Sequence, residues 1–169
     1  VNINPGFVFG GSATQYFVGE FDGKEFHCDS KPETVKWLDW GKDHYATVTF
    51  SNLGERIVAV PWMSNWQYAN ITPIRQYRGA NALPRELKLF SNNGETYLSA
   101  NVVEEARALR KETKEIGQVE VDNANPYVQR NLFSNHNGAF EIEADINPGN
   151  SDVVGLSLFN DKEERTLVY

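Results

Sequence analysis

Short apolar segments separated by compact turns run through most of this 169-residue chain. The segments at 45–50 and 85–90 are rich in aromatic and apolar side chains at the length of a strand. Asp22-Gly23 and Asn93-Gly94 are two-residue signals for a β-hairpin. Consecutive hairpins at this spacing predict an all-β fold, and the pattern alone leaves open a propeller, a barrel or a sandwich.

One predicted strand, 56–63, is almost continuously apolar, as expected where both faces of a strand are buried. It contains Pro61, which cannot donate to a β-ladder and therefore predicts an edge or a bulge. The complete set of predicted strands is 14–21, 45–50, 56–63, 85–90, 95–102, 139–146 and 153–160. A turn at Asn137-Gly138 precedes the sixth.

A single segment, 103–115, predicts a helix, because it combines good helix formers with Gly117 as a stop. A lone charged helix between two sets of strands is typical of a connector. The predicted organisation is therefore a first domain over 1–102, a connector helix over 103–118 and a second β domain over 119–169.

Composition limits the possible partners. The net charge is −7, which argues against nucleic acid, because that binding depends on cationic side chains. The single cysteine, Cys28, cannot form an internal disulfide, and no apolar run approaches the roughly 20 residues of a membrane span. The chain opens with Val1 rather than Met, so a processed or trimmed start is expected and the missing signal peptide says nothing about secretion.

The densest group of binding-type side chains is 62–68, WMSNWQY, directly after a buried strand. A Trp62 or Trp66 face can stack on the C–H side of a sugar ring, while amides such as that of Asn65 can bond its hydroxyls. The alternative is that both indoles belong to the core.

A second group, 37–45, places Asp39 and Lys42 within nine residues that lead into a strand. Charge-assisted hydrogen bonds from these two side chains could hold sugar hydroxyls. The alternative is a polar turn capped by Asp and solvated by Lys. Asp39 and Asp43 as a catalytic pair are disfavoured, because four residues of extended chain span roughly 13 Å and retaining glycosidases need about 5–5.5 Å.

Metal and cofactor chemistry finds no support in the sequence. The histidines, His27, His44 and His136, lack metal-ligand spacing, and there is no nucleophile elbow, phosphate loop or dinucleotide fingerprint. No metal and no cofactor are expected.

Four segments together resemble the glycoside hydrolases that act on fructosyl bonds: levanases, inulinases, exo-β-fructosidases and invertases. They are GSATQYFVGEFDG at 11–23, LDWGKDHYA at 38–46, WMSNWQYA at 62–69 and LPREL at 83–87. The resemblance implies an all-β fold: the last blades of a five-bladed β-propeller, joined by a short helix to part of a β-sandwich. It also implies hydrolysis with retention, by a carboxylate nucleophile and a carboxylic acid.

The family's three acidic residues lie in motifs of the types Trp-Met-Asn-Asp-Pro-Asn-Gly, Arg-Asp-Pro and Glu-Cys-Pro, and none occurs in this chain. No catalytic residue is therefore expected here, and the chain alone should be inactive. The resemblance implies that Trp66 walls the fructose subsite and that Asp39 and Lys42 lie toward the leaving group. Trp62 and Asn65 complete the predicted substrate-binding set, while Arg85 and Glu86 are expected to form a scaffold ion pair.

The function implied is hydrolysis of fructosyl bonds in levan, inulin or sucrose, with this chain supplying a wall of the pocket. The alternative is a non-catalytic carbohydrate-binding or interaction module. The expected partners are a fructan or sucrose and either the remainder of the enzyme, a companion chain or a second copy, with no nucleic acid and no membrane span. The resemblance also suggests a secreted or periplasmic protein.

Overall fold

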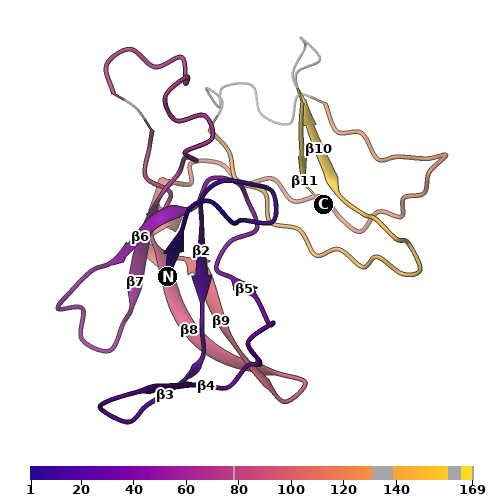
Figure 1. Cartoon of the computed structure of the whole chain (residues 1–169). Helices are drawn as coiled ribbons and strands as arrows, with labels where there is room; N and C mark the ends of the chain where they lie inside the picture. The colour runs from indigo at the N-terminus through magenta and orange to yellow at the C-terminus, as the bar shows by residue number, and fades with distance from the viewer. Residues whose placement is uncertain (78, 131–138, 160–164, 169) are drawn as a thin grey trace. The chain divides into compact units, whose positions relative to one another are not determined.

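The computed structural model describes residues 1–77, 79–130, 139–159 and 165–168. They fall into two compact units, Val1–Thr113 and Lys114–Tyr169, which are described separately here (Figure 1). The strands of both units pair antiparallel, and the helix content is a single short 3-10 helix among the described residues. The prediction of an all-β chain is confirmed.

The first unit is built on a four-stranded antiparallel sheet of order β6-β7-β8-β9. Each strand pairs with its neighbour in sequence, so the sheet is a simple meander, which is the form of one propeller blade. Its strands are β6 (Tyr45–Thr49), β7 (Val58–Trp62), β8 (Arg85–Asn92) and β9 (Glu95–Val102). The predicted turn between the last two is confirmed: Asn93 and Gly94 have φ of 50° and 80°, as a type I′ hairpin requires.

A β-bulge places Pro61 inside this sheet without a lost ladder bond. Tyr45 pairs with Trp62 and Val48 with Val60, so two residues of β6 face Pro61 alone. Ala46, one of those two, has a φ of 50°. The bulge predicted at Pro61 is confirmed, and it brings Tyr45 beside Trp62.

A second, three-stranded sheet has the order β1-β2-β5, formed by β1 (Asn2–Ile3), β2 (Ala13–Tyr16) and β5 (Lys36–Trp37). The hairpin of β3 (Gly19–Phe21) and β4 (Phe26–Cys28) confirms the turn predicted at Asp22-Gly23. The strand predicted over 14–21 is two strands, because β2 pairs with β5 whereas β3 pairs with β4. The Asn2 amide joins the two sheets: it accepts from the Thr47 backbone N–H at 3.0 Å.

The helix predicted over 103–115 is wrong in length and type. Only Glu104–Leu109 is helical, as one 3-10 helix (η1), and none of its residues is buried. An isolated helix of this length is unstable unless an apolar face packs against something, and η1 has no such face. It is instead tied down by charge: the Arg56 guanidinium contacts Glu105 at 2.7 Å and Glu86 at 3.4 Å.

The second unit contains the hairpin of β10 (Leu156–Phe159) and β11 (Arg165–Val168). Of the strand predicted over 153–160, residues 156–159 form β10, residues 153–155 are not in a strand, and residue 160 lies outside the described residues. The strand predicted over 139–146 is wrong, because none of these residues is in a strand of the described structure. The turn predicted at Asn137-Gly138 lies outside the described residues.

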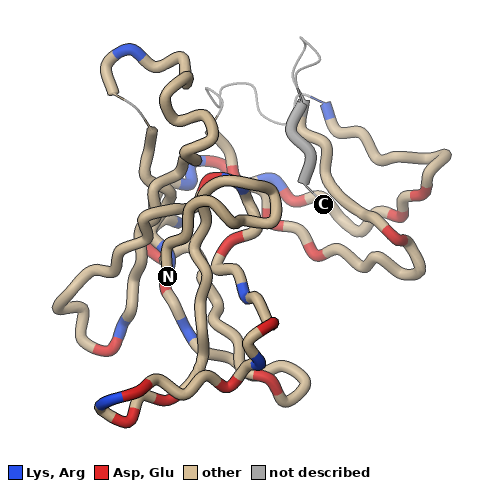
Figure 2. Tube along the Cα trace, viewed as in Figure 1, with Lys and Arg blue, Asp and Glu red and all other residues tan. Residues whose placement is uncertain are grey.

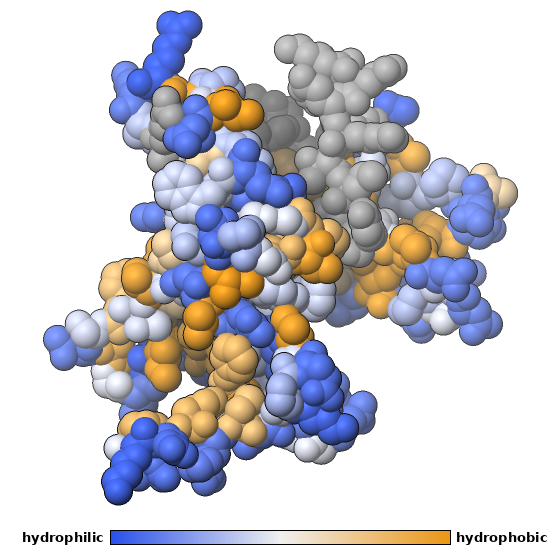
Figure 3. Space-filling view, viewed as in Figure 1, coloured by the Kyte–Doolittle hydropathy of each residue, from blue (hydrophilic) through white to orange (hydrophobic). Residues whose placement is uncertain are grey.

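The core of the first unit is small. Its buried apolar side chains are Phe7, Ala13, Val58, Ala59, Pro61 and Ala69. Larger apolar side chains, including Val48, Phe50 and Leu89, are more than half exposed, and Figure 3 shows apolar side chains at the surface of this unit. Across the described ranges, no helix has the length and apolar character needed to cross a bilayer.

Candidate functional site

The loop that follows β7 is set by Asn65. Its carbonyl oxygen accepts from the backbone N–H of Tyr68 at 3.1 Å and of Ala69 at 2.9 Å, and its side-chain Oδ1 accepts from the N–H of Gln67 at 2.9 Å. An Asn whose side chain and carbonyl both close on the following residues starts a tight turn. Trp66 is the first residue within that turn, and it is 50% exposed.

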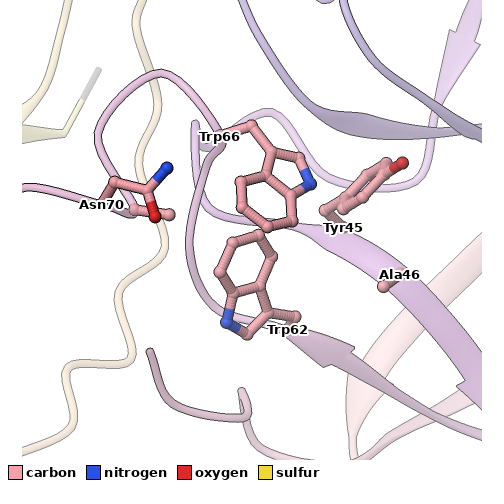
Figure 4. A pocket seen from close by; sticks show the side chains of 6 residues that line it. Tyr45, Ala46, Trp62, Trp66 and Asn70 are labelled. Atoms are coloured by element: carbon pink, nitrogen blue, oxygen red, sulfur yellow. The ribbon is translucent and has the colours of Figure 1, made fainter. Parts of the chain in front are cut away.

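Trp62 and Trp66 form the main wall of a pocket of about 350 Å³ (Figure 4). Their ring centroids are 5.2 Å apart, with planes inclined at 54°, and the Tyr45 ring lies 6.4 Å from that of Trp62. The volume is in the range of small-molecule sites, roughly 300–1,000 Å³. The lining residues are Tyr45, Ala46, Trp62, Trp66, Ala69 and Asn70, none of which carries a charge.

The Trp62 indole is held from behind by the returning chain. Gly79 has a φ of 82°, and a Cβ added there would lie 2.1 Å from Trp62 Nε1. Only glycine allows the backbone to pass this close. The N–H of Met63 donates to the carbonyl of Ala80 at 2.7 Å, which fixes the same approach.

Asp39 and Lys42 belong to the same unit as this pocket but do not line it. Asp39 forms an ion pair of 2.9 Å with Arg85 and accepts from the N–H of Gly41 at 2.8 Å. The predicted ion pair between Arg85 and Glu86 is wrong, because Asp39 takes the arginine, and Glu86 faces Arg56.

Lys42 connects the two predicted groups of binding residues. Its side chain is exposed, and Nζ lies 5.9 Å from the centre of the Tyr68 ring. The Tyr68 hydroxyl in turn donates to the Asp43 carboxylate. Burial, reinforced by that bond to Asp43, raises the pKa of Tyr68 above its usual value, so Tyr68 stays protonated and remains a donor.

Asn65 is fully buried, and its side-chain amide contacts backbone groups of two other segments, at Gly10 and Ser12 and at Lys42. The structure thus gives four of the five predicted binding residues an exposed or partly exposed side chain, and encloses the fifth.

His44, which the sequence suggested only as an unlikely metal ligand, is buried within hydrogen-bond distance of Thr14 Oγ1 at 3.1 Å. Burial lowers its pKa, with the charge of Asp39 acting in the opposite direction and that of Arg85 reinforcing the shift. A neutral imidazole here serves the fold, because it fills the space between β2 and β6 with a satisfied polar group.

Sequence reasoning missed Tyr45, Ala46, Ala69 and Asn70 as pocket residues. Tyr45 and Ala46 could have been found from the bulge at Pro61, which turns the start of β6 toward Trp62. Asn70 carries no such signal, since its place depends on the turn that begins at Asn65.

Comparisons with known proteins agree with one family. Residues 1–100 match the model of the glycosyl hydrolases family 32 N-terminal domain. A levanase of Bacillus subtilis is 34% identical over 174 residues, covering 99% of this chain and 25% of its own length. An extracellular exo-inulinase of Aspergillus niger is 43% identical over 104 residues, covering 57% of this chain and 19% of its own length.

Solved structures agree. A fructofuranosidase from Schwanniomyces occidentalis, complexed with fructose, matches with a TM-score of 0.54 and 39% identity over 60% of this chain and 21% of its own. An exo-inulinase from Aspergillus awamori matches with a TM-score of 0.52 and 38% identity, over 58% and 20%. These family 32 structures have an N-terminal β-propeller, so the meander β6–β9 is part of one.

The chain spans about a quarter or less of the length of these relatives. The family model nevertheless covers more than half of the chain, and the segments that it matches include both groups of predicted binding residues. This chain belongs to glycosyl hydrolases family 32, with residues 1–100 in its N-terminal domain.

Proposed function

We propose that this chain is part of a retaining β-fructosidase that hydrolyses fructosyl bonds in levan, inulin or sucrose. In this proposal it supplies one wall of the sugar pocket, and the nucleophile and the acid/base are carried outside these 169 residues. Family membership and the names of the matching relatives, among them a levanase and exo-inulinases, support the substrate class.

The observation that carries the proposal is the Trp62–Trp66 pocket. Trp66 is 50% exposed and lines the pocket, so its indole is not buried in the core. In Figure 4, Asn70 and the Tyr45 ring flank Trp66, which places hydrogen-bonding groups beside an apolar face. A sugar ring presents that combination, with C–H bonds on its face and hydroxyls at its edge.

Charge also favours a neutral ligand. None of the six lining residues carries a charge, and the chain has a net charge of −7. Figure 2 shows acidic and basic residues interspersed along the described trace. A phosphorylated or polyanionic ligand would need the cationic side chains that this pocket lacks.

Asp39, Lys42 and Trp62 join Trp66 in the proposed substrate-binding set, with Asp39 and Lys42 toward the leaving group. The exposed ammonium of Lys42 can donate to a hydroxyl. Asp39 keeps a partly exposed carboxylate while paired with Arg85, which would orient it for a sugar. The role of Asn65 differs and is argued in the next subsection.

The proposal extends to organisation and location. We infer a propeller portion over 1–102, a connector over 103–118 and the start of a β-sandwich over 119–169. Further propeller segments would come from the same polypeptide, a companion chain or a second copy. Secretion or periplasmic export is supported by relatives that are named extracellular.

Titration calorimetry of the chain with inulin-type and levan-type fructo-oligosaccharides tests the proposal. Trp66→Ala should weaken binding at least tenfold, equivalent to about 1.4 kcal/mol. Phe21→Ala is the control, since Phe21 is an exposed aromatic residue on the β3–β4 hairpin outside the pocket. Failure of the wild-type chain to bind, or equal binding by the Trp66 variant, would overturn the proposal.

A further inference from the structure

Asn65 joins three segments that are distant in sequence. Its side-chain Nδ2 donates to the carbonyl oxygens of Gly10, Ser12 and Lys42, at 3.3, 3.3 and 2.8 Å. Its Oδ1 accepts from the backbone N–H of Ser12 at 3.3 Å and of Gln67 at 2.9 Å. No part of Asn65 is exposed. Every hydrogen-bonding atom of this amide is thus committed to the protein.

Ser12, also fully buried, makes a second connection to the same loop. Its hydroxyl accepts from the backbone N–H of Trp66 at 3.3 Å and donates to Asn4 Oδ1 at 3.0 Å. Asn65 and Ser12 together are called here the Asn65–Ser12 network. This network fixes the backbone at the start of the turn, which is Asn65, and at the pocket wall, which is Trp66.

The backbone is shaped to admit this amide. Gly11 lies between the two carbonyls that Asn65 contacts, with a φ of 75°, and a Cβ added there would lie 2.0 Å from Asn65 Oδ1. Glycine is required at position 11 both by the positive φ and by the close contact, so the backbone of this segment is suited to the network. Releasing the buried amide toward a ligand would leave several backbone groups without hydrogen-bond partners, which is unfavourable in a buried site.

We propose that Asn65 is a positioning residue of the sugar site, which sets the backbone at Trp66 and at Lys42 together and does not itself touch the sugar. The inference rests on the proposed function. Trp66 directly follows Asn65 in the chain, and the shortest hydrogen bond of the Asn65 side chain is to the Lys42 carbonyl. One amide therefore fixes the relative placement of the aromatic wall and the cation, two groups 24 residues apart in sequence.

Two variants separate this role from direct contact. Asn65→Asp keeps the size and the acceptor for Gln67 but removes both donors, and it places a carboxylate against three carbonyls. Trp66→Phe shortens the wall while leaving measurable affinity. If Asn65 acts through Trp66 and Lys42, the loss of affinity in the double variant is smaller than the product of the two single losses.

Calorimetry with a fructo-oligosaccharide on the full chain should show at least a fivefold loss for Asn65→Asp, with Asn101→Ala, an exposed amide on β9, as the unchanged control. The Trp66 indole N–H signal should also shift in Asn65→Asp without ligand, while that of Trp40 stays in place. Should Asn65→Asp fail to fold, Ser12→Ala replaces it, because it removes the acceptor of the Trp66 N–H and spares the amide.

Losses that multiply, or an unmoved Trp66 signal, would overturn the positioning role. Unchanged affinity in Asn65→Asp, with a clear loss in Trp66→Phe, would do the same and leave the proposed function standing. Unchanged affinity in Trp66→Phe and in Trp66→Ala would instead count against the proposed function itself.

Discussion

Trp66 is exposed because of its neighbours. The buried side-chain amide of Asn65 fixes the backbone directly before Trp66, and the Ser12 hydroxyl accepts from the Trp66 backbone N–H. With the backbone held at both points, the indole has no route into the small core and lies over the pocket. The exposure of one aromatic side chain is thus determined by two buried polar ones.

Gly11→Ala should be much more destabilising than an ordinary glycine substitution. Gly11 and Gly54 both have positive φ, 75° and 65°, but an added Cβ meets Asn65 Oδ1 at Gly11 and nothing within 4 Å at Gly54. Strain in the backbone alone costs of order 1–3 kcal/mol, and the clash adds to it. Urea unfolding of both variants checks this, and equal losses of unfolding free energy would show that the clash relaxes freely.

His44 makes stability depend on pH. Burial lowers its pKa in the folded state below the 6.5 of the unfolded chain, so the unfolded state binds more protons between those values. The free energy of unfolding should therefore fall as pH drops below 6.5 and stay level above it.

The replacement His44→Gln removes this titration but keeps a partner for Thr14. The difference in unfolding free energy between wild type and variant should vary with pH below 6.5 and be constant above it. A difference that is independent of pH would mean that His44 is solvated when folded.

The proposed binding residues divide by how far their signals reach in sequence. The accessibility of Trp62, Trp66 and Lys42 could be predicted, because all three lie in recognisable groups at the ends of strands. Asn65 could be predicted as important but not as buried, since its partners lie 23 and 53 residues away. The ion pair of Asp39 with Arg85 could not be predicted for the same reason, because the two residues are 46 positions apart in the sequence.

Among the strands and helices, predictions from local sequence signals were correct at the hairpin turns. Asn93-Gly94 and Asp22-Gly23 set hairpins through their own backbone preferences. The helix at 103–115 failed because helix-forming residues do not suffice without a packed face, and η1 ends at Leu109. The prediction of a strand over 139–146 failed because an alternating side-chain pattern is not sufficient by itself to form a strand.

The short helix η1 depends on one ion pair. Arg56 contacts Glu105 through both guanidinium nitrogens and lowers the pKa of that carboxyl to about 2. Glu105→Gln should release η1, so trypsin should cleave faster after Arg107 and Arg110.

The matched control is Glu104→Gln, which loses only a pair within the helix, to Arg107. It should be cleaved at close to the wild-type rate. Equal rates in all three proteins would mean that Arg56 does not hold the connector.

For the whole molecule, the small core and the exposed apolar side chains indicate surfaces that need covering. Val48 is 66% and Leu89 64% exposed, on strands of the same sheet. The register of the sheet places them on opposite faces, and apolar side chains exposed in this way mark an interface or lead to aggregation. The family relationship explains it, since a propeller blade packs between neighbouring blades.

The chain on its own should therefore self-associate as its concentration rises. Sedimentation velocity should show species above the monomer mass, reduced when Val48 and Leu89 are both replaced by Ser. Ile71→Ser, in a loop and 81% exposed, is the control and should not reduce association. A strictly monomeric wild-type chain at all concentrations would contradict an uncovered sheet.

The most direct test of the sugar pocket follows the four indole N–H signals by NMR while a fructo-oligosaccharide is added to the chain. The account predicts that Trp62 and Trp66 shift together, along one binding curve, while Trp37, packed against Phe7 at 5.0 Å, stays in place. Binding that moves other indoles and leaves Trp66 unchanged would contradict it.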